Sequence, residues 1–81
     1  MDNWYVYIVR CSDDTLYTGI TNDIDKRIEK HNSGKGAKYT KYRAPVVLVY
    51  SEMCKDRAEA SRREYRIKQM DRAHKEQLLS K

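Results

Sequence analysis

Two runs of β-branched and aromatic residues near the N-terminus constrain the fold most strongly, because the short polar segment between them predicts a hairpin. The runs are residues 4–11 (WYVYIVRC) and 15–20 (TLYTGI), and residues 12–15 (SDDT) are a turn cluster. A period of two places Tyr5, Tyr7, Val9 and Cys11 on one face of the first strand. If Cys11 lies opposite Thr15, the register pairs Val9 with Tyr17 and Tyr7 with Gly19. Tyr7 and Tyr17 are then diagonal neighbours, and Gly19 leaves space beside Tyr7.

The remaining elements follow from helix caps and apolar runs. We expect a helix over about residues 22–31, capped by Thr21 or Asn22 and ended by residues 32–34, then a loop over 33–45. The apolar run 46–50 predicts a central strand buried on both faces and extending to Met53 or Cys54. Asp56 should cap a helix through about Gln69, and a last helix should run from Asp71 to Leu79. The predicted order is ββαβαα within a single domain, residues 1–81.

Charge favours a polyanionic partner. Seventeen Lys and Arg against twelve Asp and Glu give a formal net charge of +5, which favours nucleic acid first and a membrane surface second. The chain also has seven Tyr, one Trp and no Phe. Seven tyrosines are more than a small core needs, so some of the hydroxyls could have a functional role.

Several classes of protein are disfavoured by the sequence. The N-terminal residues Met1 to Trp4 lack the basic and apolar regions of a secretory signal, and no apolar run reaches the roughly 18 residues of a membrane span. We therefore expect a cytoplasmic protein with no membrane association. Cys11 and Cys54 are expected to be reduced, buried thiols. A structural zinc site is excluded because the cysteines, His31 and His74 lack the paired spacing of zinc ligands.

The first helix presents two polar side chains beside its short apolar face. Ile24 and Ile28 define that face, His31 falls between them in angle, and Arg27 lies on the flank, one turn before His31. An Arg on a helix flank is commonly solvated, and a His in an apolar stripe is commonly a packed core residue. Tyr7 and Tyr17 are likewise ordinary core candidates.

Glu64 is unusual because it points from the least charged face of the second helix. One interpretation is an ion pair with Lys68 four residues later. The other is an inward carboxylate that binds a hard divalent cation such as Mg²⁺, which needs few protein ligands because it keeps much of its hydration shell. Together with the two tyrosines, Arg27 and His31, such a carboxylate would supply what phosphodiester hydrolysis needs: a proton acceptor, positive charge and help for the leaving oxygen.

The loop over 33–45 interleaves basic and aromatic side chains. Such side chains can neutralise backbone phosphates and stack on bases or cover ribose; the alternative is a flexible, solvated loop. The candidate nucleic-acid-binding residues are Lys35, Lys38, Tyr39, Lys41, Tyr42 and Arg43.

The chain resembles the GIY-YIG nucleases. Residues 5–7 (YVY), ten residues before residues 17–19 (YTG), are similar to the two half-motifs that name the superfamily. Arg27 and His31 look like the family's helix Arg and the His or Tyr one turn after it, and Glu64 looks like its metal-binding Glu. The resemblance covers nearly the whole chain and is greatest to the small, stand-alone bacterial members. The superfamily also includes homing endonucleases and the N-terminal nuclease domain of the bacterial excision-repair incision subunit.

The resemblance implies a compact α/β (α+β) domain with a three-stranded mixed or antiparallel sheet flanked by helices. It also implies roles for five residues. Tyr7 would help deprotonate the attacking water and Tyr17 would position water or phosphate. Arg27 would steady the phosphorane charge, and His31 would hold or relay the Tyr7 proton. Glu64 would bind one divalent ion, Mg²⁺ or Mn²⁺, at the leaving oxygen.

Three positions depart from the family pattern. Tyr5 stands where the name-giving Gly would be, Ile20 stands where the repair nucleases carry a Lys, and the last helix offers Gln77 where many members have an Asn. The losses at 20 and 77 remove polar help from the site.

The sequence thus predicts an endonuclease with low sequence specificity that acts on nucleic acid, DNA before RNA, in repair or recombination. The alternative from another class is a nucleic-acid-binding module of the same fold that cuts little or nothing. A third interpretation, a protein-interaction domain, rests only on Leu78 and Leu79, and the sequence indicates no protein partner.

Overall fold

The strand β1 (Trp4–Arg10) forms the centre of a three-stranded antiparallel sheet of order β2-β1-β3. Its neighbours are β2 (Leu16–Thr21) and β3 (Val47–Cys54). The computed structural model describes residues 3–80, so Met1, Asp2 and Lys81 of the predicted 1–81 domain lie outside the described residues. The helices are α1 (Ile24–Asn32), α2 (Arg57–Lys68) and α3 (Arg72–Leu79), in the predicted order ββαβαα.

The hairpin has the predicted register. Tyr7 pairs with Gly19 and Val9 with Tyr17, and the Cys11 N–H donates to the Thr15 carbonyl at 2.8 Å. Asp14 takes a positive φ of 69° in the turn, a conformation that Asp tolerates better than most residues.

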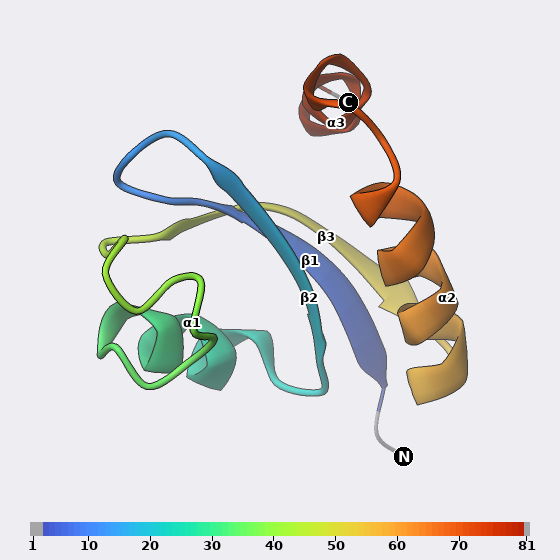
Figure 1. Cartoon of the computed structure of the whole chain (residues 1–81). Coiled ribbons are helices and arrows are strands. Elements are labelled where there is room, and N and C mark those ends of the chain that lie inside the picture. Colours follow the sequence, from blue (N-terminus) through green and yellow to red (C-terminus); the bar gives the residue numbers. More distant parts are fainter. Residues whose placement is uncertain (1–2, 81) are drawn as a thin grey trace.

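The two faces of β1 are buried by different helices. Tyr7, Val9 and Cys11 pack with Val46, Tyr17 and Ile28 on the α1 side. Val6 and Ile8 pack with Cys54 and with Ala60 and Ile67 of α2 on the other side. Figure 1 shows α1 and α2 on opposite sides of the sheet. The alternation predicted from a period of two is therefore confirmed, and both cysteines are free and buried as expected.

The predicted central strand is wrong, because β3 is an edge strand. Among residues 3–80, β3 pairs with β1 alone. Val47 and Met53 of this strand are 61% and 63% exposed. A continuous apolar run does not reveal how many neighbours a strand has. The strand buried on both faces is β1, where Val6 to Val9 have no exposed surface.

The cap of α1 also differs from the prediction. Asp23, rather than Thr21 or Asn22, is the N-cap, and its carboxylate accepts from the Lys26 N–H at 3.2 Å. Thr21 supports this cap, since its Oγ1 accepts from the Asp23 N–H at 3.1 Å. The predicted caps Asp56 and Asp71 are confirmed for α2 and α3.

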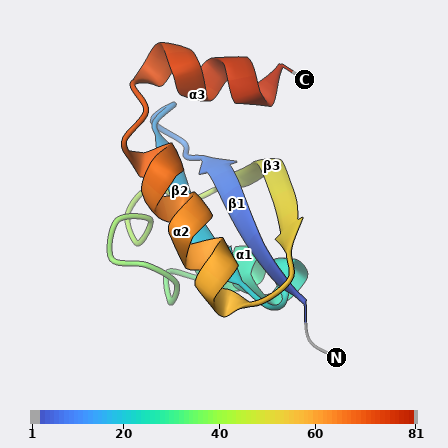
Figure 2. The same ribbon diagram turned by 90° about the vertical axis from the view of Figure 1, so that its right-hand side faces the viewer.

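The helix α3 lies across the end of the molecule that carries the β1–β2 turn. Figure 2 shows α2 running along the sheet and α3 turning away at its end. Arg10 forms an ion pair with Glu76 at 3.2 Å, and Arg72 with Asp14 at 3.4 Å. Leu78 and Leu79 are partly buried against the α2-side core, so they are used in packing rather than offered to a partner. Within residues 3–80, no helix is long and apolar enough to cross a membrane.

Candidate active site

The Tyr7 ring lies directly over Gly19 on the neighbouring strand. A Cβ added at Gly19 would be 2.6 Å from the Tyr7 hydroxyl oxygen and 2.8 Å from Cζ, closer than real Cβ contacts allow. The space that the sequence predicts beside Tyr7 is therefore present and is filled by the phenol. The missing side chain of Gly19 lets Tyr7 extend across β2 toward α1.

The Tyr7 hydroxyl is held between two side chains of α1. Its oxygen lies 2.7 Å from His31 Nε2 and accepts from Arg27 Nε at 3.3 Å. Tyr7 and His31 have no exposed surface, and Arg27 is partly buried. Three of the five predicted site residues thus form one hydrogen-bonded cluster.

Thr40 fixes the proton on His31. Its Oγ1 donates its only proton to the Ala37 carbonyl at 3.0 Å and lies 2.6 Å from His31 Nδ1. With that hydroxyl proton assigned to Ala37, we infer that Nδ1 carries a proton and donates it to Thr40. Nε2 of a neutral His31 is then an acceptor, so the Tyr7 hydroxyl donates to it.

Sequence reasoning missed Thr40, which is fully buried. It lies in a loop without periodicity, nine residues after His31, among lysines and tyrosines. The close approach of this loop to His31 also involves Gly36, where a Cβ would be 2.5 Å from Nδ1.

Burial sets the protonation of the cluster. It raises the pKa of Tyr7 above its ordinary value, while the hydrogen bond and charge of Arg27 act in the opposite direction. Burial, aided by the Arg27 charge, lowers the pKa of His31. At neutral pH the cluster therefore holds a phenol and a neutral imidazole.

Tyr17 lies beside this cluster and is covered by aromatic and basic side chains. Its ring is 5.4 Å from the His31 ring in an edge-on arrangement and stacks on Tyr39 at 5.7 Å. Lys68 Nζ of α2 lies 5.8 Å from the centre of the Tyr17 ring. The β2 edge of the sheet therefore brings α1, α2 and the loop over residues 33–45 (the basic loop) together.

Glu64 forms the ion pair with Lys68 that is one of the two interpretations of the sequence. Its Oε2 lies 3.3 Å from Lys68 Nζ, and its side chain is 23% exposed. The Glu64 charge also contributes to the raised pKa of Tyr7, so the carboxylate lies within electrostatic reach of the phenol. A divalent cation bound at Glu64 would replace this contact with Lys68.

The donor set around Glu64 fits one kind of metal ion. Within residues 3–80, no group of three or more His, Cys, Asp or Glu side chains could form a cage for a metal. One carboxylate is enough for Mg²⁺, which keeps several waters and takes phosphate oxygens from the substrate. The residues thus fit an ion that binds together with substrate.

The basic loop is partly ordered by its own side chains. Arg43 lies 4.2 Å over the Tyr39 ring, donates to the Tyr39 carbonyl at 2.7 Å and forms an ion pair with Asp13 at 3.0 Å. Tyr42 is 86% exposed, with Lys41 Nζ 5.4 Å from its ring centre. None of the ion pairs within residues 3–80 involves Lys35, Lys38 or Lys41. The three lysines are therefore free to meet an anion, whereas Arg43 is engaged internally.

The other residues singled out in the sequence lie outside the hydrogen-bonded cluster of Tyr7, His31 and Arg27. Tyr5 is partly buried on β1 opposite Thr21. Ile20 is partly buried against the α2-side core. Gln77 is exposed on α3, whose neighbouring Glu76 pairs with Arg10 and Arg72 near the hairpin turn.

Comparison with known proteins matches residues 3–77 to the GIY-YIG catalytic domain. A UPF0213 protein of Staphylococcus saprophyticus is 58% identical over 80 residues, which cover 99% of this chain and 98% of that protein. One from Desulfotalea psychrophila is 60% identical over 77 residues, covering 94% and 70%.

Two solved structures share the fold. The solution NMR structure of a UPF0213 protein from Bacillus halodurans is 52% identical, covers 96% of this chain and 83% of that one, and gives a TM-score of 0.63. The solution NMR structure of an E. faecalis protein is 36% identical, covers 99% and 88%, and gives a TM-score of 0.65.

Proposed function

The chain belongs to the GIY-YIG catalytic domain family, and we propose that it is a metal-dependent endonuclease that hydrolyses phosphodiester bonds in DNA with low sequence specificity. GIY-YIG domains are generally endonucleases that bind nucleic acid and use divalent metal ions. The observation that carries the proposal is the hydrogen-bonded cluster of Tyr7, His31 and Arg27 at the β2 edge.

Tyr7 acts as a proton relay. A phenol with a raised pKa is by itself a poor base. In the inferred tautomer of His31, however, the phenol donates its proton to Nε2. When the Tyr7 oxygen takes a proton from the attacking water, its own proton passes to His31. The hydroxide adds to phosphorus, and the bond from phosphorus to the leaving oxygen breaks. The imidazole that Thr40 holds as the Nδ1–H tautomer is able to accept it.

Arg27 links the relay to the phosphate. Its guanidinium covers the Tyr7 hydroxyl, which is otherwise buried. A substrate phosphate draws Arg27 toward the developing phosphorane charge, which also opens the hydroxyl to water. Tyr17, partly exposed beside Tyr7, positions the water or the phosphate.

Glu64 is the residue that would hold the metal, Mg²⁺ or Mn²⁺, when substrate is present. A bound divalent ion stabilises negative charge on the leaving oxygen. Glu64 would exchange its contact with Lys68 for this ion, and Lys68 would remain next to Tyr17 as a positive charge near the phosphate.

The partner is nucleic acid, with DNA favoured over RNA, in the cytoplasm and in repair or recombination. The lysines of the basic loop at 35, 38 and 41 meet backbone phosphates, and Tyr39 and Tyr42 lie next to bases or sugars. Arg43 supports this surface by stacking on Tyr39.

A second candidate is a binding module of the same fold that does not cut. Two observations favour it. The Glu64 carboxylate is already paired with the Lys68 ammonium, and Tyr7 has no exposed surface. Ile20 and Gln77 also leave the site without polar groups common in the family.

Substitution of Glu64 by Gln separates the two candidates. Gln removes the charge that a hard cation requires, so divalent-dependent cleavage of duplex, flap and single-stranded DNA should be abolished. Binding should persist, because it depends on the basic loop. The free energy of unfolding should change by less than about 1 kcal/mol, since the lost partner is one partly exposed i+4 pair.

Glu59→Gln on the same helix is the matched control and should leave cleavage unchanged. Wild-type protein that binds DNA but cuts none of these substrates with Mg²⁺ or Mn²⁺ would reject the nuclease in favour of the binding module. Cleavage by Glu64→Gln at the wild-type rate would remove Glu64 from the mechanism.

A further inference from the structure

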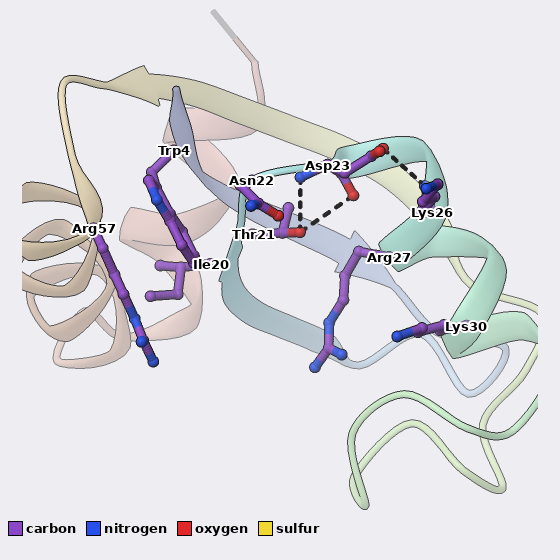
Figure 3. A pocket seen from close by; sticks show the side chains of 9 residues that line it. All are labelled: Trp4, Ile20, Thr21, Asn22, Asp23, Lys26, Arg27, Lys30 and Arg57. Atoms are coloured by element: carbon purple, nitrogen blue, oxygen red, sulfur yellow. Dashed lines mark hydrogen bonds between the residues drawn. The ribbon is translucent and has the colours of Figure 1, made fainter. Parts of the chain in front are cut away.

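A cleft of about 380 Å³ opens beside the Tyr7 cluster, between the start of α1 and the start of α2. Figure 3 shows Trp4 and Arg57 side by side on one flank, Arg27 and Lys30 on the other, and Thr21, Asn22 and Asp23 between them. The volume lies at the small end of the range of about 300–1,000 Å³ typical of ligand sites. The cleft is therefore suited to one unit of a polymer rather than to a helix.

The charge of the cleft favours an anion. Its lining carries four cationic side chains and one carboxylate, Asp23, which is engaged as the N-cap of α1. None of the ion pairs within residues 3–80 involves the four cations, which are Lys26, Arg27, Lys30 and Arg57. A second cleft on α2 holds three arginines but also Glu52 and Glu59, and Glu52 already pairs with Arg63 at 3.1 Å.

The cleft also has an aromatic wall. Trp4 is partly exposed, and the Arg57 guanidinium lies 5.4 Å from the centre of its ring. An indole next to free cations suits a ligand with both a flat ring and a phosphate, because bases stack on aromatic rings while Lys and Arg neutralise the backbone.

Arg27 joins the cleft to the reactive cluster. Its side chain lines the cleft and its Nε donates to the Tyr7 hydroxyl at 3.3 Å. A phosphate that Arg27 holds at the cluster would have its neighbouring nucleotide directly at the mouth of the cleft.

We propose that this cleft binds one nucleotide of the substrate strand, adjacent to the phosphate that is cut, with the base against Trp4 and the phosphate on Lys26, Lys30 and Arg57. The assignment rests on the proposed function for the identity of the polymer. It gives the strand a path past the edge strand β2, between the starts of α1 and α2, in addition to the basic loop.

Trp4 supplies a direct readout, because it is the only Trp in the chain. In EDTA, where no cutting occurs, a short single-stranded deoxyoligonucleotide should quench Trp4 fluorescence with the same midpoint as binding measured by anisotropy of a labelled copy. An oligonucleotide of the same length with abasic sites should bind without comparable quenching.

Two arginines of α2 form a matched pair of variants. Arg57→Ala should weaken binding severalfold at low salt and reduce the log-log salt slope by about 0.7, the value for one phosphate contact on a single strand. Arg66→Ala, on the second cleft, should leave both unchanged. Both side chains are exposed, so neither change should affect folding.

Binding without quenching of Trp4, or an equal loss in Arg57→Ala and Arg66→Ala, would overturn the cleft assignment. Equal quenching by the abasic oligonucleotide would overturn the stacking of a base on Trp4. Cleavage by wild-type protein with Mg²⁺ distinguishes these failures from failure of the proposed function: cutting without quenching rejects the cleft alone, whereas neither binding nor cutting rejects both.

Discussion

Thr40 determines which nitrogen of His31 is protonated, and this can be tested without any substrate. Thr40→Val keeps the shape but removes the acceptor of the Nδ1–H. The His31 imidazole should then lose its preference for the Nδ1–H tautomer, visible in the ¹⁵N chemical shifts of labelled histidine. The variant leaves the buried Nδ1–H without a partner, which should lower the free energy of unfolding by about 1–3 kcal/mol.

Thr40→Ser is the matched control, since it keeps the hydroxyl and should keep the tautomer. His74, whose side chain is 66% exposed and next to Asp71, provides an internal reference in the same spectrum. A Thr40→Val protein with an unchanged tautomer would contradict the relay direction from Tyr7 to His31.

Gly19 is required by the Tyr7 ring rather than by its own backbone. Gly19→Ala would place a methyl group 2.6 Å from the Tyr7 hydroxyl oxygen and 2.8 Å from Cζ. We expect the free energy of unfolding, measured with urea, to decrease by about 1–3 kcal/mol, as is typical of overpacking. Tyr7→Phe in the same protein should recover part of this loss, because it removes the hydroxyl but not the ring carbon. Strict additivity of the two changes would show that the contact is not the cause.

At the scale of elements, the basic loop should carry salt-dependent binding. Replacing Lys38 and Lys41 by Ala should reduce the log-log salt slope of DNA binding by at most about two units. Arg62→Ala with Arg66→Ala on α2 is the control of equal charge and should leave the slope unchanged. The reverse result would place the binding face on α2.

Local patterns predicted most of the elements. The hairpin register follows from the shortest plausible turn between Cys11 and Thr15. The proximity of Arg27 and His31 follows from helical phase. Both are short-range properties. The sequence could not show that β3 has one neighbour, since strand order depends on the path of the whole chain. Asp23, rather than Thr21 or Asn22, caps α1 because three adjacent residues can all cap and their backbone angles decide.

The site was predicted less completely than the fold. Tyr7, Arg27 and His31 meet as expected, but Thr40 reaches His31 through an irregular loop, and Trp4 and Arg57 come together from β1 and α2. Contacts of this kind arise from the packing of distant segments, for which neither periodicity nor spacing gives a signal. Arg43 was expected to meet phosphate, yet its contacts with Asp13 and Tyr39 depend on how the loop folds back onto the hairpin turn.

At the scale of the whole molecule, burial of neutral His31 should make stability depend on pH. The pKa of His31 is lowered in the folded protein below its ordinary value of 6.5, by burial and by the Arg27 charge. Well above pH 6.5 neither folded nor unfolded His31 binds a proton, so the free energy of unfolding is independent of this group. As pH falls below 6.5, His31 becomes protonated in the unfolded state but stays neutral in the folded state. The free energy of unfolding therefore decreases until the pH reaches the pKa of His31 in the folded protein. Each unit between the two pKa values costs about 1.4 kcal/mol.

Urea unfolding between about pH 7.5 and pH 5 measures this dependence in a range where the paired carboxylates are still ionised. Asp13, Asp14 and Glu76, whose pKa values are lowered by hydrogen bonds to Thr15, Arg10 and Arg10 respectively, begin to lose their contribution only at lower pH. His74→Asn should keep the decline, and His31→Asn should lose it. Titration by NMR gives the same result directly, because His31 should remain neutral at a pH where protonation of an ordinary His is well advanced. A His31 that titrates at or above 6.5 would contradict this prediction, because the folded protein would then accommodate an imidazolium beside Arg27.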